Sequence, residues 1–73
     1  MEQFDLAANV GRNLKKLFAE EGKTYADVAE LLHCDERTVG RWIQNGVDKL
    51  SIISYIADVF GVKAEDIIFS KED

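Results

Sequence analysis

The chain has 73 residues, 47% of them hydrophobic, and its formal net charge at pH 7 is −5. This length predicts one small domain, residues 1–73, and the hydrophobic content is enough for a packed core, which excludes an intrinsically disordered chain. A single cysteine excludes an internal disulfide, and no cluster of Cys and His has the spacing of metal ligands, so we expect no metal and no cofactor. The first residues lack the basic start and apolar run of a signal peptide, and no segment can span a membrane, so we expect a cytoplasmic protein.

The first predicted helix begins after Asp5, a suitable N-cap, and runs to about Glu21. Its apolar residues recur at helical spacing and form one stripe: Leu6, Val10, Leu14, Leu17 and Phe18. Gly22 follows, and glycine readily takes the left-handed conformation that ends a helix. The pattern predicts an amphipathic helix of about four turns.

The second predicted helix is capped by Thr24, with Asp27 three residues later in a weaker form of the capping box. Its apolar side consists of Val28, Ala29, Leu31 and Leu32. His33 comes next and is expected to form the turn, because histidine is enriched among the non-glycine residues that have a positive φ.

Asp35 is expected to cap the third helix, which spans roughly Glu36 to Gln44. Its buried face has the i, i+3, i+4 spacing of an amphipathic helix and consists of Val39, Trp42 and Ile43. Its outward face consists of Glu36, Arg37, Gly40, Arg41 and Gln44. The pair Asn45-Gly46 is a strong stop, since both residues accept a left-handed backbone.

The spacing of these two helices is that of a helix-turn-helix. Two short helices that cross steeply need a small side chain where they touch, which Ala29 supplies, and a residue such as His33 that tolerates the turn. Val39 and Trp42 then anchor the second of the two helices onto the body. The outward face of that helix is therefore the expected working surface.

The rest of the chain predicts two more helices. Asp48 can cap the fourth, whose apolar set is Leu50, Ile53, Ile56, Ala57 and Phe60. Gly61 ends it, and a short fifth helix covers about Ala64 to Ile68. Three apolar residues lie near the end of the chain: Ile67, Ile68 and Phe69. We expect one or two of them to pack inward and the remainder to form a symmetric dimer contact. Five short helices joined by brief turns predict a compact all-α bundle.

Three segments together carry a resemblance to a known family: TYADVAELL, RTVGRWIQN and IADVFGVKAEDII. In this order and with these gaps, the chain resembles the lambda-repressor-like, or Cro/Xre-type, helix-turn-helix family from about Asn9 to Phe69. The resemblance implies a bacterial or phage transcriptional regulator, a repressor that binds double-stranded operator DNA as a homodimer. It implies no enzymatic activity.

The chain departs from the family pattern at several positions. Tyr25 stands where the family often has Gln, and His33 where it usually has Gly. The family also tends to pair an Arg late in its first helix with a Glu near the end of its third. Phe18 and Ile43 occupy those positions here, and replacing a buried ion pair by packed hydrocarbon is often neutral or stabilising. We therefore expect Phe18 and Ile43 to touch.

Six residues of the third helix are candidates for DNA contact through bases or backbone: Glu36, Arg37, Thr38, Gly40, Arg41 and Gln44. An arginine in the major groove can bond guanine O6 and N7 together, or bind a flanking phosphate. Arg41 is better placed for phosphate, since it lies further along the helix. The alternative is that Arg37 and Arg41 are solvated charges paired with Glu36 or nearby acids.

The other candidates on this helix also have two interpretations. Gly40 gives room for a base, a methyl group or a close approach of DNA, or it is a neutral surface substitution. Glu36 can accept from cytosine N4, although the plainer role is to stabilise the helix N-terminus. Gln44 can read adenine, and Thr38 can bond phosphate or cap locally.

Three further residues are candidates for contact with the DNA backbone: Tyr25, Lys23 and Asn45. A tyrosine hydroxyl can donate to phosphate over a longer reach than glutamine. A basic patch on the first helix is expected to be an ordinary solvated face: Arg12, Lys15 and Lys16.

Charge keeps two functions open. A net charge of −5 gives poor long-range steering toward phosphate, so it does not by itself support nucleic-acid binding. The first hypothesis is a DNA-binding regulator; the second is an antitoxin-like or regulatory protein-interaction module that keeps the fold without strong DNA binding. With one His, one Cys and no nucleophile–base pair, the chain has no catalytic residue to propose, and we expect no small-molecule substrate.

Overall fold

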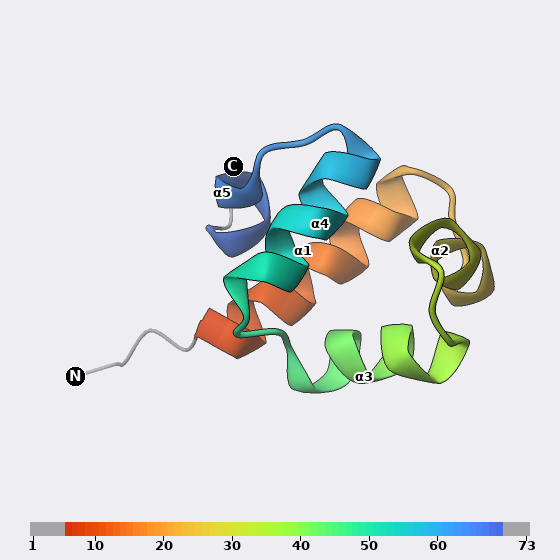
Figure 1. The fold of residues 1–73 in the computed structure, drawn as a ribbon. Coiled ribbons are helices and arrows are strands. Elements are labelled where there is room, and N and C mark those ends of the chain that lie inside the picture. Colours follow the sequence, from red (N-terminus) through yellow and green to blue (C-terminus); the bar gives the residue numbers. More distant parts are fainter. Residues whose placement is uncertain (1–5, 70–73) are drawn as a thin grey trace.

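A computed structural model describes residues 6–69, and in that range the chain is all-α with five helices (Figure 1). They are α1 Leu6–Glu20, α2 Tyr25–Leu32, α3 Glu36–Asn45, α4 Leu50–Phe60 and α5 Ala64–Ile68. The predicted five-helix bundle is confirmed. The predicted N-cap Asp5 lies outside the described residues. None of the helices between residues 6 and 69 is long and apolar enough to cross a membrane.

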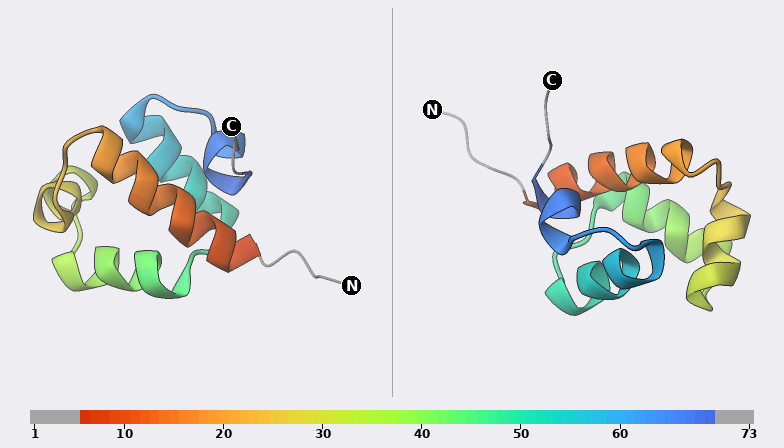
Figure 2. Two further views of the ribbon diagram at one scale, coloured as in Figure 1. Left: turned by 180° about the vertical axis from the view of Figure 1, so that it is seen from behind. Right: turned by 90° about the horizontal axis from the view of Figure 1, so that it is seen from above.

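The longest helix is α1, and the fifth helix, α5, packs against both α1 and α4. Helix α1 packs against α3 on one side and α5 on another, while α2 packs against both α3 and α4. Figure 2 shows α2 at one end of the domain, standing across α3, with α5 at the opposite end near the start of α1. This arrangement leaves the side of α3 that faces away from α1 and α4 at the surface (Figure 1).

One hydrophobic core joins all five helices. Its buried members are Val10, Leu14, Phe18, Val28, Ala29, Leu32, Val39, Val47, Ile53, Ile56, Ala57 and Ile67. Two residues expected on the apolar faces lie outside it, because Leu31 is 43% exposed and Leu50 is 62% exposed. Leu31 falls beside the narrow buried stripe of α2, and Leu50 is the first residue of α4, beyond the edge of the core.

The helix starts confirm one predicted cap and correct another. The Thr24 N–H donates to Asp27 Oδ2 at 3.0 Å and the Asp27 N–H donates to Thr24 Oγ1 at 3.1 Å, so the capping box is present. These bonds from Thr24 hold the pKa of the Asp27 carboxyl below its ordinary value. The cap predicted at Asp48 is wrong: α4 starts after Lys49, one residue later, and lysine has no acceptor to cap it. Asp35 is the N-cap of α3, but its side chain makes no cap hydrogen bond.

The turn and the end of α3 follow the predicted backbone. His33 has φ 59° and ψ 48°, so it takes the left-handed conformation expected of it. Helix α3 extends one residue further than predicted, to Asn45, and Gly46 then has φ 84°. A Cβ atom on Gly46 would lie 1.8 Å from the carbonyl oxygen of Ala7, so only glycine fits there.

A second glycine sets the contact between α1 and α3. A Cβ on Gly11 would lie 2.7 Å from the carbonyl oxygen of Ile43 and 3.2 Å from that of Trp42. The two helices therefore approach closely at the start of α1. Phe18 lies about two turns further along α1, and its ring packs on Phe60 with the ring centroids 5.3 Å apart. The expected contact between Phe18 and Ile43 stays a prediction. The Ile43 backbone lies beside Gly11, about two helical turns from Phe18, and this position argues against the contact.

Two asparagines of α1 hold the short last helix. Asn13 Nδ2 donates to the carbonyl oxygen of Ile67 at 2.6 Å, and Asn9 Nδ2 donates to that of Ile68. Asn9 is buried, and its Oδ1 accepts from Arg12 Nη2 at 2.7 Å. Because the last carbonyls of a helix have no partner within it, these bonds satisfy the end of α5. They also give Arg12 a structural role.

Candidate functional site

The helix-turn-helix consists of α2, the turn at residues 33–35 and α3. Ala29 is buried where the two helices meet the core, as the crossing requires. Val39 is fully buried, whereas Trp42 and Ile43 are half-buried and pack against the core. The scaffold predicted from the spacing is therefore present.

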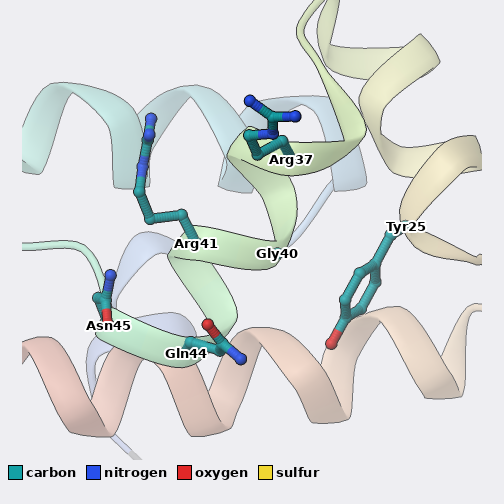
Figure 3. Close-up of a pocket in the computed structure, with 6 residues that line it drawn as sticks. All are labelled: Tyr25, Arg37, Gly40, Arg41, Gln44 and Asn45. Carbon is teal, nitrogen blue, oxygen red and sulfur yellow. The ribbon is translucent and has the colours of Figure 1, made fainter.

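The outward side of α3 forms one wall of an open groove of about 490 Å³. Its lining comes from two elements and contains six of the nine predicted contact residues: Tyr25, Arg37, Gly40, Arg41, Gln44 and Asn45. Figure 3 shows the Arg37 and Arg41 side chains extending in the same direction from α3, with the Tyr25 ring on the other side of Gly40. The structure thus brings together residues that are up to 20 positions apart in the chain.

The charge of this groove differs from that of the whole chain. Among the residues that the structure describes, its lining carries two arginines and no carboxylate, although the chain has a net charge of −5. Between residues 6 and 69, neither Arg37 nor Arg41 makes a side-chain hydrogen bond or an ion pair, so the alternative pairing with Glu36 is not seen there. Both guanidinium groups are exposed and keep their donors for an external acceptor.

Tyr25 and Gly40 lie next to each other in the groove lining. The Tyr25 side chain is 36% exposed, and two of its ring carbons lie 3.9 Å from the position that a Cβ on Gly40 would take. The ring therefore lies beside the bare backbone of α3. Its apolar face borders the groove, and its hydroxyl gives the groove a polar atom.

The remaining three candidates lie apart from the groove lining. Glu36 is exposed in the first turn of α3, where a carboxylate stabilises the helix N-terminus. Thr38 is half-buried. Lys23 lines a different depression with Asp27, Glu30 and Leu31, so the structure does not group it with the arginines.

Sequence reasoning missed the residues that position α3. The Tyr55 hydroxyl of α4 donates to the carbonyl oxygen of Leu32 at 3.2 Å and so supports the start of the turn. Nothing local in the sequence marks this bond, because its partners are 23 residues apart. Gly11 carried a readable signal, since a glycine inside a predicted helix costs about 1 kcal/mol relative to alanine and needs a reason.

Comparison with known proteins agrees with this geometry. A family model described as a homeodomain-like domain matches residues 14–51, which include all of α2 and α3. The chain belongs to the homeodomain-like domain family. The helix-turn-helix class predicted from the sequence is confirmed, whereas the Cro/Xre type stays a prediction.

A solved structure shows the same fold as this homeodomain-like chain. It is that of the hypothetical transcription factor NHTF from Neisseria, with a TM-score of 0.80 and 23% sequence identity over 89% of this chain and 76% of that one. At this identity the likeness concerns the fold. No curated protein matches the chain.

Proposed function

We propose that this chain is a sequence-specific transcriptional regulator, a repressor of the Cro/Xre type, that reads the DNA major groove with α3. The observation that carries the proposal is the groove on the outward side of α3, the second helix of a helix-turn-helix. Arg37 and Arg41 are exposed there and make no ion pair with any residue from 6 to 69. A major groove about 12 Å wide admits an α-helix, and arginine is the commonest reader of guanine. The homeodomain-like family and a neighbour titled a transcription factor support this function over an enzymatic one.

Each groove residue has a proposed role. Arg37 is the second residue of α3, near the end that enters the groove first, and is assigned to guanine O6 and N7. Arg41 follows one turn later and is assigned to a phosphate, as is the Tyr25 hydroxyl at the start of α2. Gln44 can bond adenine, and Asn45 can donate to the backbone.

The other predicted contacts are supporting ones. Glu36 and Thr38 flank Arg37 in the first turn of α3 but lie outside the groove lining. Lys23 lies before α2 and would bind a more distant phosphate. We expect these three to affect affinity less than the two arginines.

We propose that two copies bind a two-fold operator as a homodimer. One small domain makes few base contacts, and two domains on adjacent major grooves multiply the affinity. At the end of the described chain Ile67 is buried and Ile68 packs against the core, as expected for one or two of the three apolar residues there. Phe69 is 57% exposed, and this supports a self-association surface around it.

The proposal is tested by selecting a duplex from a random library and measuring its binding against salt concentration for the wild type and single variants. Arg37→Ala is expected to weaken binding about tenfold or more and to relax the preference at one base pair. Arg41→Ala is expected to weaken binding to all sequences and to lower the salt slope by about 1. Lys63→Ala is the control, because it removes one positive charge just before α5, away from α3.

The two functions give opposite results in this experiment. If both arginine variants bind like the wild type, or if the Lys63 variant weakens binding as much as they do, α3 is not the reading helix. The second candidate, a protein-interaction module, is favoured by the net charge of −5 and by a depression that contains Asp27 and Glu30. It predicts that no duplex is selected at low salt.

A further inference from the structure

The glycines of this chain divide into those that the fold requires and one that it does not. Gly22, Gly46 and Gly61 have positive φ, and a Cβ on Gly11 or Gly46 would meet backbone at less than 3 Å. Gly40 has neither feature, because it lies inside α3 and a Cβ there would meet only the Tyr25 ring, at an ordinary contact distance of 3.9 Å. Alanine would fit this position and would favour the helix. Between residues 6 and 69, the fold therefore does not require glycine at position 40.

The space beside Gly40 forms a notch in the groove, where a Cβ atom on Gly40 would be in van der Waals contact with the Tyr25 ring. One wall is the bare backbone of α3, and the other consists of Tyr25 Cδ2 and Cε2 (Figure 3). The Gly40 Cα and the Tyr25 ring carbons are apolar, while the polar side chains of the groove lie around the notch: Arg37, Arg41 and Gln44. A thymine that is paired with, or stacked next to, a purine bonded by Arg37 or Gln44 would bring its 5-methyl group toward the notch.

We propose that the notch between Gly40 and Tyr25 accepts the 5-methyl group of a thymine and so sets the sequence preference of α3. This inference rests on the proposed DNA-binding function. Thymine is the base that presents a methyl group in the major groove, and apolar contact with that methyl is a recognised way of reading it. The methyl group would lie against the Tyr25 ring, in space that the Cβ of an alanine at position 40 would otherwise take.

The test compares thymine with deoxyuridine, which lacks only this methyl group. A duplex selected from a random library by the wild type is remade with each thymine replaced singly by deoxyuridine, and binding is measured for three proteins. One replacement is expected to lower the affinity of the wild type about fourfold, the factor for one buried methyl-sized group. Gly40→Ala is expected to bind both duplexes alike, because its own methyl fills the notch.

Two controls separate this role from a structural one. Tyr25→Phe keeps the ring wall and loses the hydroxyl, so it is expected to keep the fourfold ratio whatever happens to its overall affinity. Gly40→Ala is expected to have a melting temperature equal to or higher than that of the wild type, since alanine favours a helix. A lower melting temperature would show that the fold needs this glycine and would overturn the proposal.

The remaining outcomes are also decisive. The proposal is overturned if the selected site has no thymine whose methyl matters, or if Gly40→Ala keeps the wild-type ratio. It is also overturned if folded Gly40→Ala binds no duplex, which would indicate close approach of DNA to the glycine backbone instead. In each of these cases the wild type still binds DNA and the proposed function stands. If the wild type selects no duplex, the proposed function fails and the notch fails with it.

Discussion

The two sides of α3 are built on different principles. Its inner side is fixed by close packing. Val39 is fully buried, and the Ile43 carbonyl oxygen lies so near Gly11 that a Cβ atom on Gly11 would clash with it. Its outer side has Arg37 and Arg41 exposed, with no ion pair to any residue between 6 and 69. On this one helix, packing within the domain therefore restricts the residues of the inner side but not those of the outer side.

This difference predicts that the inner side of α3 contributes to stability and that the outer side is available for binding. Substitutions on the inner side remove packing or force the backbone apart, so they should lower the free energy of unfolding. Substitutions of Arg37, Arg41 or Gln44 on the outer side break no hydrogen bond between residues 6 and 69 and should change stability by no more than about 0.5 kcal/mol. The predictions below test that separation.

The largest loss of stability is expected where α3 ends against α1. Gly46→Ala places a Cβ 1.8 Å from the Ala7 carbonyl oxygen at a φ of 84°, so strain and overpacking add to a loss of about 4 kcal/mol. Gly22→Ala is the matched control, because its φ is 67° but nothing lies within 4 Å, and it should lose about 1 to 2 kcal/mol. Urea unfolding followed by Trp42 fluorescence measures both. Equal losses would show that the close approach to Ala7 does not matter.

A pair of substitutions on α3 itself compares the two sides directly. Val39→Ala removes two buried methyl groups and should lower the free energy of unfolding by about 2 kcal/mol. Gln44→Ala, on the groove side, should change it by less than about 0.5 kcal/mol. Thermal unfolding followed by circular dichroism gives both values. A large loss at Gln44 would mean that the outer side also supports the fold.

A smaller effect is expected at the turn. Tyr55→Phe removes the hydroxyl that donates to the Leu32 carbonyl oxygen, and a part-buried hydrogen bond of this kind contributes about 1 kcal/mol. Tyr25→Phe removes a hydroxyl from the groove side and should leave stability unchanged. Chemical unfolding of the two variants side by side distinguishes them, and the reverse order would contradict the assignment of Tyr55 as a positioning residue.

The smallest effect is a pH dependence at the start of α2. The bonds from Thr24 lower the pKa of Asp27 in the folded state, so its contribution to stability is present above the ordinary aspartate pKa. It is lost as pH falls below about 4 and through the folded pKa. The difference in melting temperature between the wild type and Asp27→Asn should therefore shrink from pH 6 to pH 2. A difference that stays constant over this range would exclude the carboxylate as its source.

The sequence predicted most of the scaffold because the scaffold depends on local signals. Helical periodicity located the five helices, and the capping box at Thr24 and the left-handed turn at His33 depend on residues only a few positions apart. The exact start of a helix was harder to predict: Asp48 was expected to cap α4, but Lys49 is its N-cap. Long-range bonds, such as those of Asn13 and Tyr55 to distant carbonyls, have no sequence signal.

The candidate site was predicted as a set of residues rather than as a shape. Helix periodicity put Arg37, Gly40 and Arg41 on one side of α3, and the structure places them in one groove. The chain alone could not show that the Tyr25 ring closes this groove beside Gly40, or that Lys23 lies in another depression. Both depend on the angle at which α2 crosses α3, which tertiary packing sets.

The most direct test of the division between the two sides of α3 is an NMR titration of ¹⁵N-labelled protein with a duplex selected from a random library. Binding through the groove predicts the largest shift changes at the amides of residues 36–45 and Tyr25 and at the Nε–H groups of Arg37 and Arg41, with α4 and α5 little changed. Shift changes concentrated on α4 and α5 instead, or no change with any duplex, would contradict the assignment of the outer side of α3 as the DNA-reading surface.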